Sequence, residues 1–453
     1  MYCQHLEQAK LKLNDIYYET KKEKGVIIFM QNDVCEKVYE LDGLNIYKIP
    51  FDKFKTNTIT VCFDDQLSKE RVAKNALLPE VLKQGSQSKP TMRDISVALK
   101  ELYGTVFDCG VSKKGEMQTI YFYLETIKDD FANKDEDVAN KALDLMFEII
   151  TKPLLKDGAF VDEYVKVEKD NLQNYIKSKL NDKMSYAFEK CIENMCKGEV
   201  YGIFEHGEIE DYDKINSKSL HEHYKEVLET YPISIYVTGE VKDELLNKVK
   251  ELFESIKRGK IKTIKDTVFK EAPAKIREVE ESLTINQGKL CMGYRTNVSP
   301  TTIDYYKLLV YNSILGGGIH SKLFQNVREK EGLAYYAYSR LDRFKGIMVI
   351  STGIEESDKD KVVSIVNRQM EDIQNNIISD YEFDSSKKYI ISSVNSMKDS
   401  QMSLVDFYMS GNIVRKPHTL DDVLKSVQSV TKQDVVEISK VVKPDTIYFL
   451  HGN

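Results

Sequence analysis

Apolar and polar residues follow the same order of periodicities in each half of the chain. Alternating stretches predict strands, and stretches with apolar residues three and four positions apart predict amphipathic helices. The first half gives a strand, two helices, a hairpin, two longer helices and a closing strand, at residues 58–63, 68–81, 92–103, 107–125, 137–150, 161–179 and 233–238. The second half repeats this order with one long helix, at residues 290–294, 302–315, 320–330, 335–352, 362–373 and 446–450. The pattern predicts an α+β fold of two homologous domains, each a mostly antiparallel sheet with helices packed on one face.

Two local matches support an internal duplication. The segment LKELYG at residues 99–104 corresponds to VREKEG at residues 327–332, and each leads into a predicted strand. Gly85 corresponds to Gly316, at nearly the same distance before these segments. The two halves therefore align on both glycine positions and helix ends.

The boundary between the halves is expected in a segment of alternating charge, residues 257–281, which contains Pro273. Residues 44–256 then form the first domain, and residues 282–453 form the second. Residues 1–43 have no counterpart in the second half, so we expect them to be an N-terminal extension.

The composition excludes several classes of protein. Of 453 residues, 42% are hydrophobic and 30% are charged, which excludes collagenous and wholly disordered chains. The net charge of −7 is small, so we expect neither a nucleic-acid partner nor a membrane partner. No apolar stretch approaches the roughly 20 residues of a spanning helix, and residues 1–33 contain no evident secretion signal. We expect a cytoplasmic protein.

The seven cysteines are an odd number in a large chain, which is not typical of a disulfide framework. Cys191 and Cys196 are five positions apart on a predicted helix, which fits neither a redox pair nor a zinc site. We expect all seven to be reduced, and these two to be packed in the core.

The most specific segment is LGGGIHSKLFQNVREKEGLAYYAYS, at residues 315–339. It closely resembles the second-domain signature of the M16 (insulinase-like, pitrilysin) metallopeptidase family in its glycine run, its S-K-L-F-Q helix and its R-E-K-x-G-L-A-Y turn. The resemblance extends over residues 44–453. It implies the LuxS/MPP-like metallohydrolase fold, which has the same internal duplication.

The zinc motif of active family members, H-x-x-E-H, is absent here. In that motif two His side chains bind zinc and the Glu is the general base. The glycine-anchored match places it on residues 76–80, where Ala76 and Glu80 occupy the His positions and Pro79 occupies the position of the base. The third family ligand would fall at residues 172–175, which read Leu-Gln-Asn-Tyr. We expect no metal in this chain, and the resemblance implies that a partner subunit holds the zinc.

The histidines do not suggest a replacement site. His221 and His223 are the only close pair, and residues two apart on a helix point to different sides. We expect both on the solvated surface of a helix. His320 adjoins the glycine run without a second candidate ligand, so we expect it on a helix surface or at a helix cap.

The chain keeps a second family feature, an Arg followed seven positions later by a Tyr. Arg328 and Tyr335 have this spacing. The resemblance implies that Arg328 holds a peptide through its planar guanidinium and that Tyr335 donates to the oxyanion of the reaction. The alternative is structural: Arg328 caps a helix end and Tyr335 is a half-buried strand aromatic. Tyr336 and Tyr338 are expected to pack on the sheet.

Gly316, Gly317 and Gly318 are not followed by the G-K-[ST] of a phosphate-binding loop. We expect a loop with positive φ angles and close backbone approach. The resemblance adds that this loop borders a substrate chamber.

The leading hypothesis is that the chain is the non-catalytic, substrate-binding subunit of a heterodimeric zinc peptidase. Its partner would be an H-x-x-E-H homologue, and its substrates would be small peptides. The likeness is nearest to bacterial proteins encoded beside an active homologue. Some of these are associated with elongation factor P modification, and related pairs trim leader segments from ribosomal peptides. The alternatives are a scaffold without peptidase function and a peptidase with a relocated metal site.

Overall fold

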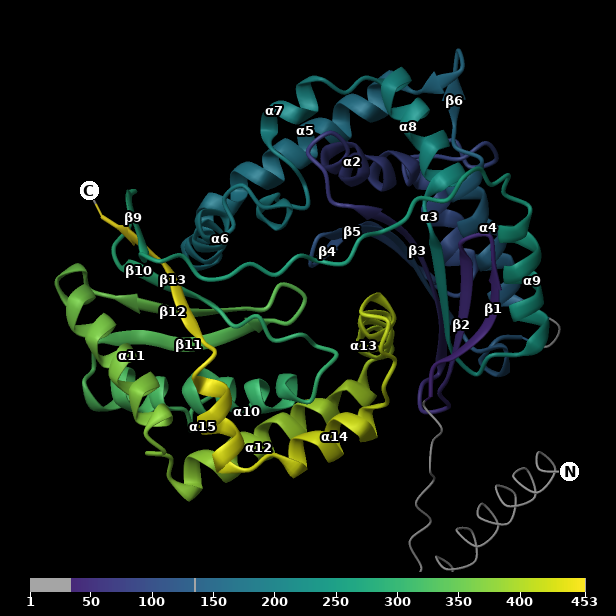
Figure 1. The fold of residues 1–453 in the computed structure, drawn as a ribbon. Coiled ribbons are helices and arrows are strands. Elements are labelled where there is room, and N and C mark those ends of the chain that lie inside the picture. The colour runs from purple at the N-terminus through teal and green to yellow at the C-terminus, as the bar shows by residue number, and fades with distance from the viewer. Residues whose placement is uncertain (1–33, 134–135, 453) are drawn as a thin grey trace, which may run out of the picture. The chain divides into compact units, whose positions relative to one another are not determined.

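The computed structural model describes residues 34–133 and 136–452, which belong to one compact unit (Figure 1). The part of the predicted extension at residues 1–33 lies outside the described residues. Two large sheets organise this unit. The six-stranded sheet contains β1 (Glu36–Leu41), β2 (Leu44–Pro50), β3 (Thr56–Gln66), β4 (Val106–Lys114), β5 (Met117–Ile127) and β8 (Ile233–Gly239). The five-stranded sheet contains β9 (Arg277–Ser282), β10 (Gly288–Arg295), β11 (Ala334–Asp342), β12 (Ile347–Ile354) and β13 (Lys443–His451).

The two sheets share one topology. The first has the order β1-β2-β8-β3-β5-β4, and the second, read from the other edge, has the order β9-β13-β10-β12-β11. In each sheet one pair is parallel, β2 with β8 and β9 with β13, and the remaining pairs are antiparallel. The α+β fold with an internal duplication is therefore confirmed, and β1 is the strand without a counterpart.

Helices accompany both sheets. Those of the first half are α2 (Val72–Leu82), α3 (Met92–Glu101), α4 (Val138–Thr151), α5 (Asp162–Ser178), α6 (Lys183–Met195), α7 (Ile209–Asp213), α8 (Ser217–Thr230) and α9 (Asp243–Glu254). Those of the second half are α10 (Asp304–Gly316), the π-helix Phe324–Lys330, α11 (Lys359–Gln374), α12 (Asp380–Ser396), α13 (Gln401–Ile413), α14 (Leu420–Ser429) and α15 (Lys432–Ser439). Short elements are the hairpin β6 (Leu155–Lys156) and β7 (Ala159–Phe160) and the 3₁₀ turns Asp129–Phe131, Lys179–Asn181, Val200–Gly202, Glu356–Asp358 and Met397–Asp399. No helix among the described residues is long and apolar enough to cross a membrane.

The apolar stripe predicted for α11 faces the core of the second half. Val362, Val366, Met370 and Ile373 are all buried. Because these residues recur every three or four positions, one side of the helix leaves water as a continuous strip. This strip fixes how α11 packs on its sheet.

Each half also sends one helix to the sheet of the other half. Helix α6 packs on β10 and β13, and α13 contacts β8 (Figure 1). The α6 contact forms a buried cluster of Ala187, Cys191, Cys291, Val349, Tyr448 and Leu450. In the α13 contact, Asn412 Nδ2 donates to the Tyr236 hydroxyl at 3.1 Å, and the sulfurs of Cys62 and Met409 are 3.8 Å apart. The face of each sheet opposite its own helices is therefore partly covered by this exchange.

A buried ion network joins the two halves. The Lys345 ammonium lies 2.8 Å from carboxylate oxygens of both Glu116 and Glu199. The Arg295 guanidinium lies 2.6 Å from Glu199 and 2.9 Å from Asp445. Glu116 and Glu199 come from the first half and the other three residues from the second. The network therefore fixes the halves against each other.

The sheets begin earlier in the sequence than the predicted domain boundaries. Strand β1 lies in the part of residues 1–43 that the structure describes, and it pairs with β2. Strand β9 lies at the end of the predicted linker, residues 257–281, and pairs with β13. Both are polar edge strands with few buried residues, so the hydrophobic pattern does not reveal them.

Candidate functional site

The positions to which the resemblance assigns the zinc motif lie on α2, and their side chains do not suit a metal. Ala76 and Pro79 are buried in the helix. The Pro79 carbonyl accepts the Lys83 N–H at 3.2 Å and the Cys109 thiol at 3.3 Å. An Ala and a Pro side chain offer no donor atom for a metal. The described residues contain no group of three His, Cys, Asp or Glu side chains that could hold a metal ion.

The one carboxylate at these positions has a lysine as its counter-charge. Glu80 forms an ion pair with Lys83, one turn further along the helix. Burial raises the pKa of Glu80. Burial also opposes the charge of Lys83, but the bond to Glu80 raises the pKa of the lysine above its usual value. The local positive charge is thus supplied by the ammonium group, and this set of residues does not fit a zinc ion.

The acidic residue of α5 that faces α2 is Glu168, which is buried and accepts a hydrogen bond from Gln84. The resemblance places the third family ligand at residues 172–175, where Leu172 is part of the apolar core; that placement stays a prediction. Sequence reasoning did not single out Glu168. Its signal is a carboxylate within the buried stripe Val165, Glu168 and Leu172, which has the three- and four-residue spacing of a helix face.

The prediction that His221 and His223 are solvated is wrong. His223 is 3% exposed, and its Nε2 lies 2.7 Å from Asn75 Oδ1. His221 is 7% exposed and packs edge-on against Phe160, with the ring centres 5.6 Å apart. Burial lowers the pKa of both imidazoles. Strand β7 of the short hairpin covers the side of α8 that carries His221, and α2 covers the side that carries His223.

His320 is also buried rather than on a helix surface or at a cap. It is 6% exposed, and its Nε2 lies 2.9 Å from the Ser386 hydroxyl and 3.4 Å from the Ser313 hydroxyl. Burial lowers the pKa of His320. The imidazole therefore joins α10 to α12 beside the glycine run.

Close backbone approach explains Gly316 and Gly317 of the glycine run, and positive φ explains none of the three. A Cβ at Gly316 would lie 2.4 Å from the Ser339 nitrogen, and one at Gly317 would lie 2.6 Å from the Ser313 Cα. None of the three glycines has a positive φ, and Gly317 has a φ of −84°. The expected left-handed loop is therefore wrong. Helix α10 continues through Gly316, and β11 passes directly against its end.

Arg328 and Tyr335 lie at either end of a short turn. Arg328 belongs to the π-helix, and its guanidinium lies 4.7 Å from the centre of the Phe324 ring. Gly332, with a φ of +64°, ends this helix and leads into β11. The pairing of β11 with β12 shifts register between Ala334 and Tyr336, so Tyr335 occupies a bulge. Bulges redirect side chains, and π-helical turns are frequent at functional sites.

The tyrosine of this pair is strongly exposed. Tyr335 is 75% exposed, whereas Tyr336 and Tyr338 are half-buried with ring centres 5.8 Å apart. The structural alternative of a half-buried Tyr335 is therefore wrong, and its two neighbours pack on the sheet as expected. The role of Arg328 and Tyr335 in catalysis stays a prediction.

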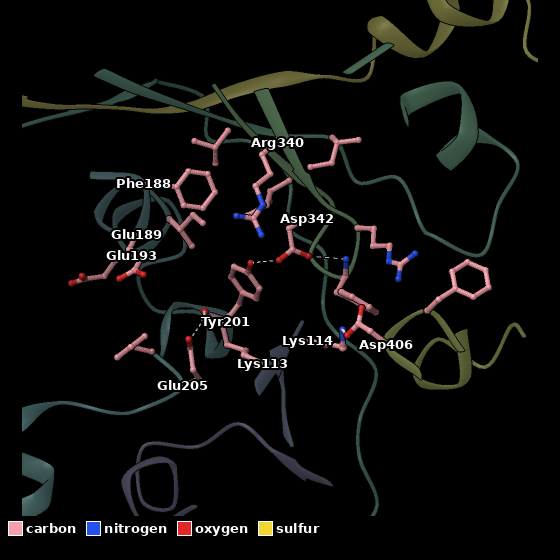
Figure 2. A pocket seen from close by; sticks show the side chains of 18 of the residues that line it. Lys113, Lys114, Phe188, Glu189, Glu193, Tyr201, Glu205, Arg340, Asp342 and Asp406 are labelled. Atoms are coloured by element: carbon pink, nitrogen blue, oxygen red, sulfur yellow. Dashed lines mark hydrogen bonds and ion pairs between the residues drawn. The ribbon is translucent and has the colours of Figure 1, made fainter. Parts of the chain in front are cut away.

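A cavity of about 1280 Å³ lies between the two halves (Figure 2). Its walls come from α5, α6, α12 and α13, from the β4–β5 and β11–β12 hairpins, and from residues 201–209. The Tyr201 hydroxyl donates to Asp342 across this space, and the Lys113 ammonium donates to the Tyr201 carbonyl at 3.2 Å. The Arg340 side chain extends from β11 into the cavity. We call this cavity the chamber.

Comparison with known proteins agrees with this geometry. Residues 214–390 match the family model described as the peptidase M16 inactive domain. A Bacillus subtilis (strain 168) protein described as probable inactive metalloprotease YmfF is 34% identical over 412 residues, 90% of this chain and 96% of that protein. The crystal structure of a conserved protein from Enterococcus faecalis V583 has a TM-score of 0.85 and 30% identity, over 92% of this chain and 99% of that one.

A more distant structure supports the fold alone. The peptidase M16 inactive domain from Pseudomonas fluorescens has a TM-score of 0.76 at 17% identity, over 92% of this chain and 98% of that one. The duplicated sheets, the absence of H-x-x-E-H from the sequence and the likeness over nearly the whole length of YmfF agree. The chain belongs to the peptidase M16 family and lacks the zinc-binding motif of its active members.

Proposed function

We propose that this chain is the non-catalytic, substrate-binding subunit of a heterodimeric M16 zinc peptidase in the cytoplasm. The observation that carries the proposal is a contrast between two sites. The metal positions on α2 are filled by Ala76, Pro79 and a lysine-paired Glu80, whereas Arg328 and Tyr335 keep the family spacing. Tyr335 is 75% exposed on a bulge, as expected of a side chain that acts on a molecule outside its own fold.

Each residue of the pair has a distinct role in the proposed complex. The guanidinium of Arg328 donates in a plane to carbonyl or carboxylate oxygens and holds the peptide in register. The hydroxyl of Tyr335 donates to the oxyanion as it develops at the scissile carbonyl. The partner, an H-x-x-E-H homologue, supplies the zinc and the general base.

The peptide in this proposal binds as an added strand. β11 is an edge strand of its sheet, so one row of its N–H and C=O groups has no strand partner among the described residues. A peptide pairing there would run from the bulge at Tyr335 to Arg340, roughly 17 Å at about 3.3 Å per residue. Main-chain pairing tolerates many sequences, which suits small unstructured peptides.

The test is reconstitution with and without the H-x-x-E-H homologue from the same genome. We expect zinc and cleavage of an unstructured peptide in the mixture only. Tyr335→Phe should lower kcat/KM by roughly a hundredfold, the order found for removal of one oxyanion donor. Arg328→Ala should also lower kcat/KM, because the peptide is then no longer held in register. Tyr381→Phe and Arg368→Ala, at exposed positions on α12 and α11, are the matched controls.

Three outcomes would overturn the proposal. Zinc and activity in the isolated chain would indicate a relocated metal site. Full activity of the Arg328 and Tyr335 variants would remove the role of the pair. Binding of the partner without any cleavage would favour an inactive scaffold.

A further inference from the structure

We propose that the chamber selects peptides bearing carboxylates and that Arg340 and Arg343 make this selection. This proposal names the class of substrate for the proposed function. It rests on that function in one respect, that peptide binds in the chamber. It concerns residues other than Arg328 and Tyr335.

Most charges that line the chamber already have a partner in the lining. The ion pairs are Lys114 with Asp406 at 2.6 Å, Lys179 with Glu189 at 2.7 Å, Lys190 with Glu193 at 2.7 Å and Lys113 with Glu205 at 4.0 Å. These eight residues contribute no net charge. Two further carboxylates are engaged by other groups. Asp342 accepts hydrogen bonds from Tyr201 and from two backbone N–H groups, and Glu208 lies at the N-terminal end of α7.

After the four ion pairs, the three cations Arg340, Arg343 and Lys177 and the two carboxylates just named remain, a net charge of +1, and the two arginines lie on one wall. Arg340 and Arg343 lie at the end of β11 and in the turn after it, and neither has an ion pair or hydrogen bond with another described residue. Each guanidinium is stacked on an aromatic ring instead. Arg340 lies 5.6 Å from the centre of the Phe188 ring, and Arg343 lies 5.0 Å from that of Phe344. Lys177, at the exposed end of α5, is a third cation without a carboxylate.

Stacking on a ring orders a guanidinium but leaves its N–H donors free. A planar fork of donors matches a carboxylate and can bind it through two parallel hydrogen bonds. Arg340 is exposed and Arg343 is half-buried, so the difference from an exposed lysine lies in this ordered planar fork and not in exclusion of water.

The position of Arg340 connects this wall with the proposed peptide strand. Tyr336, Tyr338, Arg340 and Asp342 pair with Gly353, Ser351, Val349 and Ile347, alternate residues of β12. Val349 belongs to the cluster under α6, so this row faces the chamber rather than the helix layer. A strand added to β11 would therefore bring side chains on its chamber face toward Arg340. Carboxylates on these side chains, or the carboxylate at the end of the peptide, would meet the free guanidinium groups.

The test measures peptide binding to the isolated full-length chain by calorimetry at low salt. Four peptides of one 12-residue sequence separate the sources of the carboxylate: Glu at three positions with an amidated end, Gln there with a free end, Gln with an amidated end, and Lys with an amidated end. We expect either carboxylate-bearing peptide to bind at least about tenfold more tightly than the amidated Gln peptide. The tighter of the two identifies the source of the carboxylate.

Two double variants complete the test. Arg340→Gln/Arg343→Gln should abolish the preference. Arg368→Gln/Lys388→Gln removes the same charge from exposed helix positions outside the chamber lining and should leave the preference intact. Equal binding of Glu and Gln peptides, a preference that survives loss of both arginines, or no binding of any peptide would overturn the inference. Because the assay contains no partner and measures no cleavage, failure of the proposed function would leave its result standing.

Discussion

Replacing Lys345 with methionine tests whether the buried ion network holds the two halves of the chain together. The side chain of Lys345 is 0% exposed, and those of Glu116 and Glu199 are 7% and 4% exposed. Its ammonium also donates to the Val268 carbonyl at 2.6 Å. Methionine has a similar length but no charge. The variant therefore leaves Glu116 without a cation, while Glu199 keeps Arg295.

The expected cost follows from the burial of the charges. Removing one member of a buried ion pair destabilises a protein by about 3–5 kcal/mol, because the remaining charge is left without compensation. We expect Lys345→Met to lower the free energy of unfolding by this amount in urea titrations at pH 7. Lys361→Met is the matched control, because Lys361 is 54% exposed beside Glu331 and its loss should cost less than about 1 kcal/mol.

A double-mutant cycle shows whether the cost arises from the pair. Adding Glu116→Gln to Lys345→Met removes the uncompensated charge, so the double variant should be more stable than the sum of the single effects indicates. If Lys345→Met unfolds within about 1 kcal/mol of the wild type, as the control does, the network does not couple the halves and our account of the interface is wrong.

Three further predictions concern residues near the candidate sites. Burial lowers the pKa of His223, so the unfolded chain binds a proton at this residue more readily than the folded chain does. The free energy of unfolding should therefore fall as the pH drops below about 6.5. His223→Gln should reduce this loss, measured by urea titrations between about pH 8 and pH 5. Gly316→Ala should cost about 1–3 kcal/mol in thermal unfolding because its Cβ would meet backbone. Gly259→Ala should be nearly neutral, because its Cβ would make only ordinary van der Waals contact, 3.7 Å from the Glu229 carbonyl oxygen. Equal effects would contradict the close approach at Gly316. Lys83→Met should lower the free energy of unfolding by about 1–3 kcal/mol at pH 8, because it leaves the Glu80 carboxylate without its cation. The cost should be smaller at pH 5, because burial raises the pKa of Glu80 and the carboxylate then takes up a proton more readily. A cost independent of pH would contradict the pairing.

The sequence by itself determined the duplicated fold and the absence of an H-x-x-E-H motif. The order of strand and helix periodicities appears in both sheets, because apolar spacing decides which face of each element leaves water. The motif could be found missing from residue identity alone, because ligation depends on the donor atoms that a side chain carries; its placement on Ala76, Pro79 and Glu80 stays a prediction. Glycine identity likewise located the close approach at Gly316.

Tertiary structure alone decided which side chains meet. His221, His223 and His320 carry no signal of burial in their spacing, and partners 66 to 148 positions away enclose two of them. The exchange of α6 and α13 also lies beyond any local pattern, because an amphipathic stripe shows that a helix face is buried but not which sheet buries it.

The free charge of the chamber has the same origin. Arg340 and Arg343 are two cations among 65 Lys and Arg residues, and nothing in their sequence context sets them apart. Four lysines of the chamber pair with carboxylates there, whereas these two arginines and Lys177 have no such partner among the described residues. Electrostatic pairing depends on distance in space, so only the folded chain decides which charges stay available to a ligand.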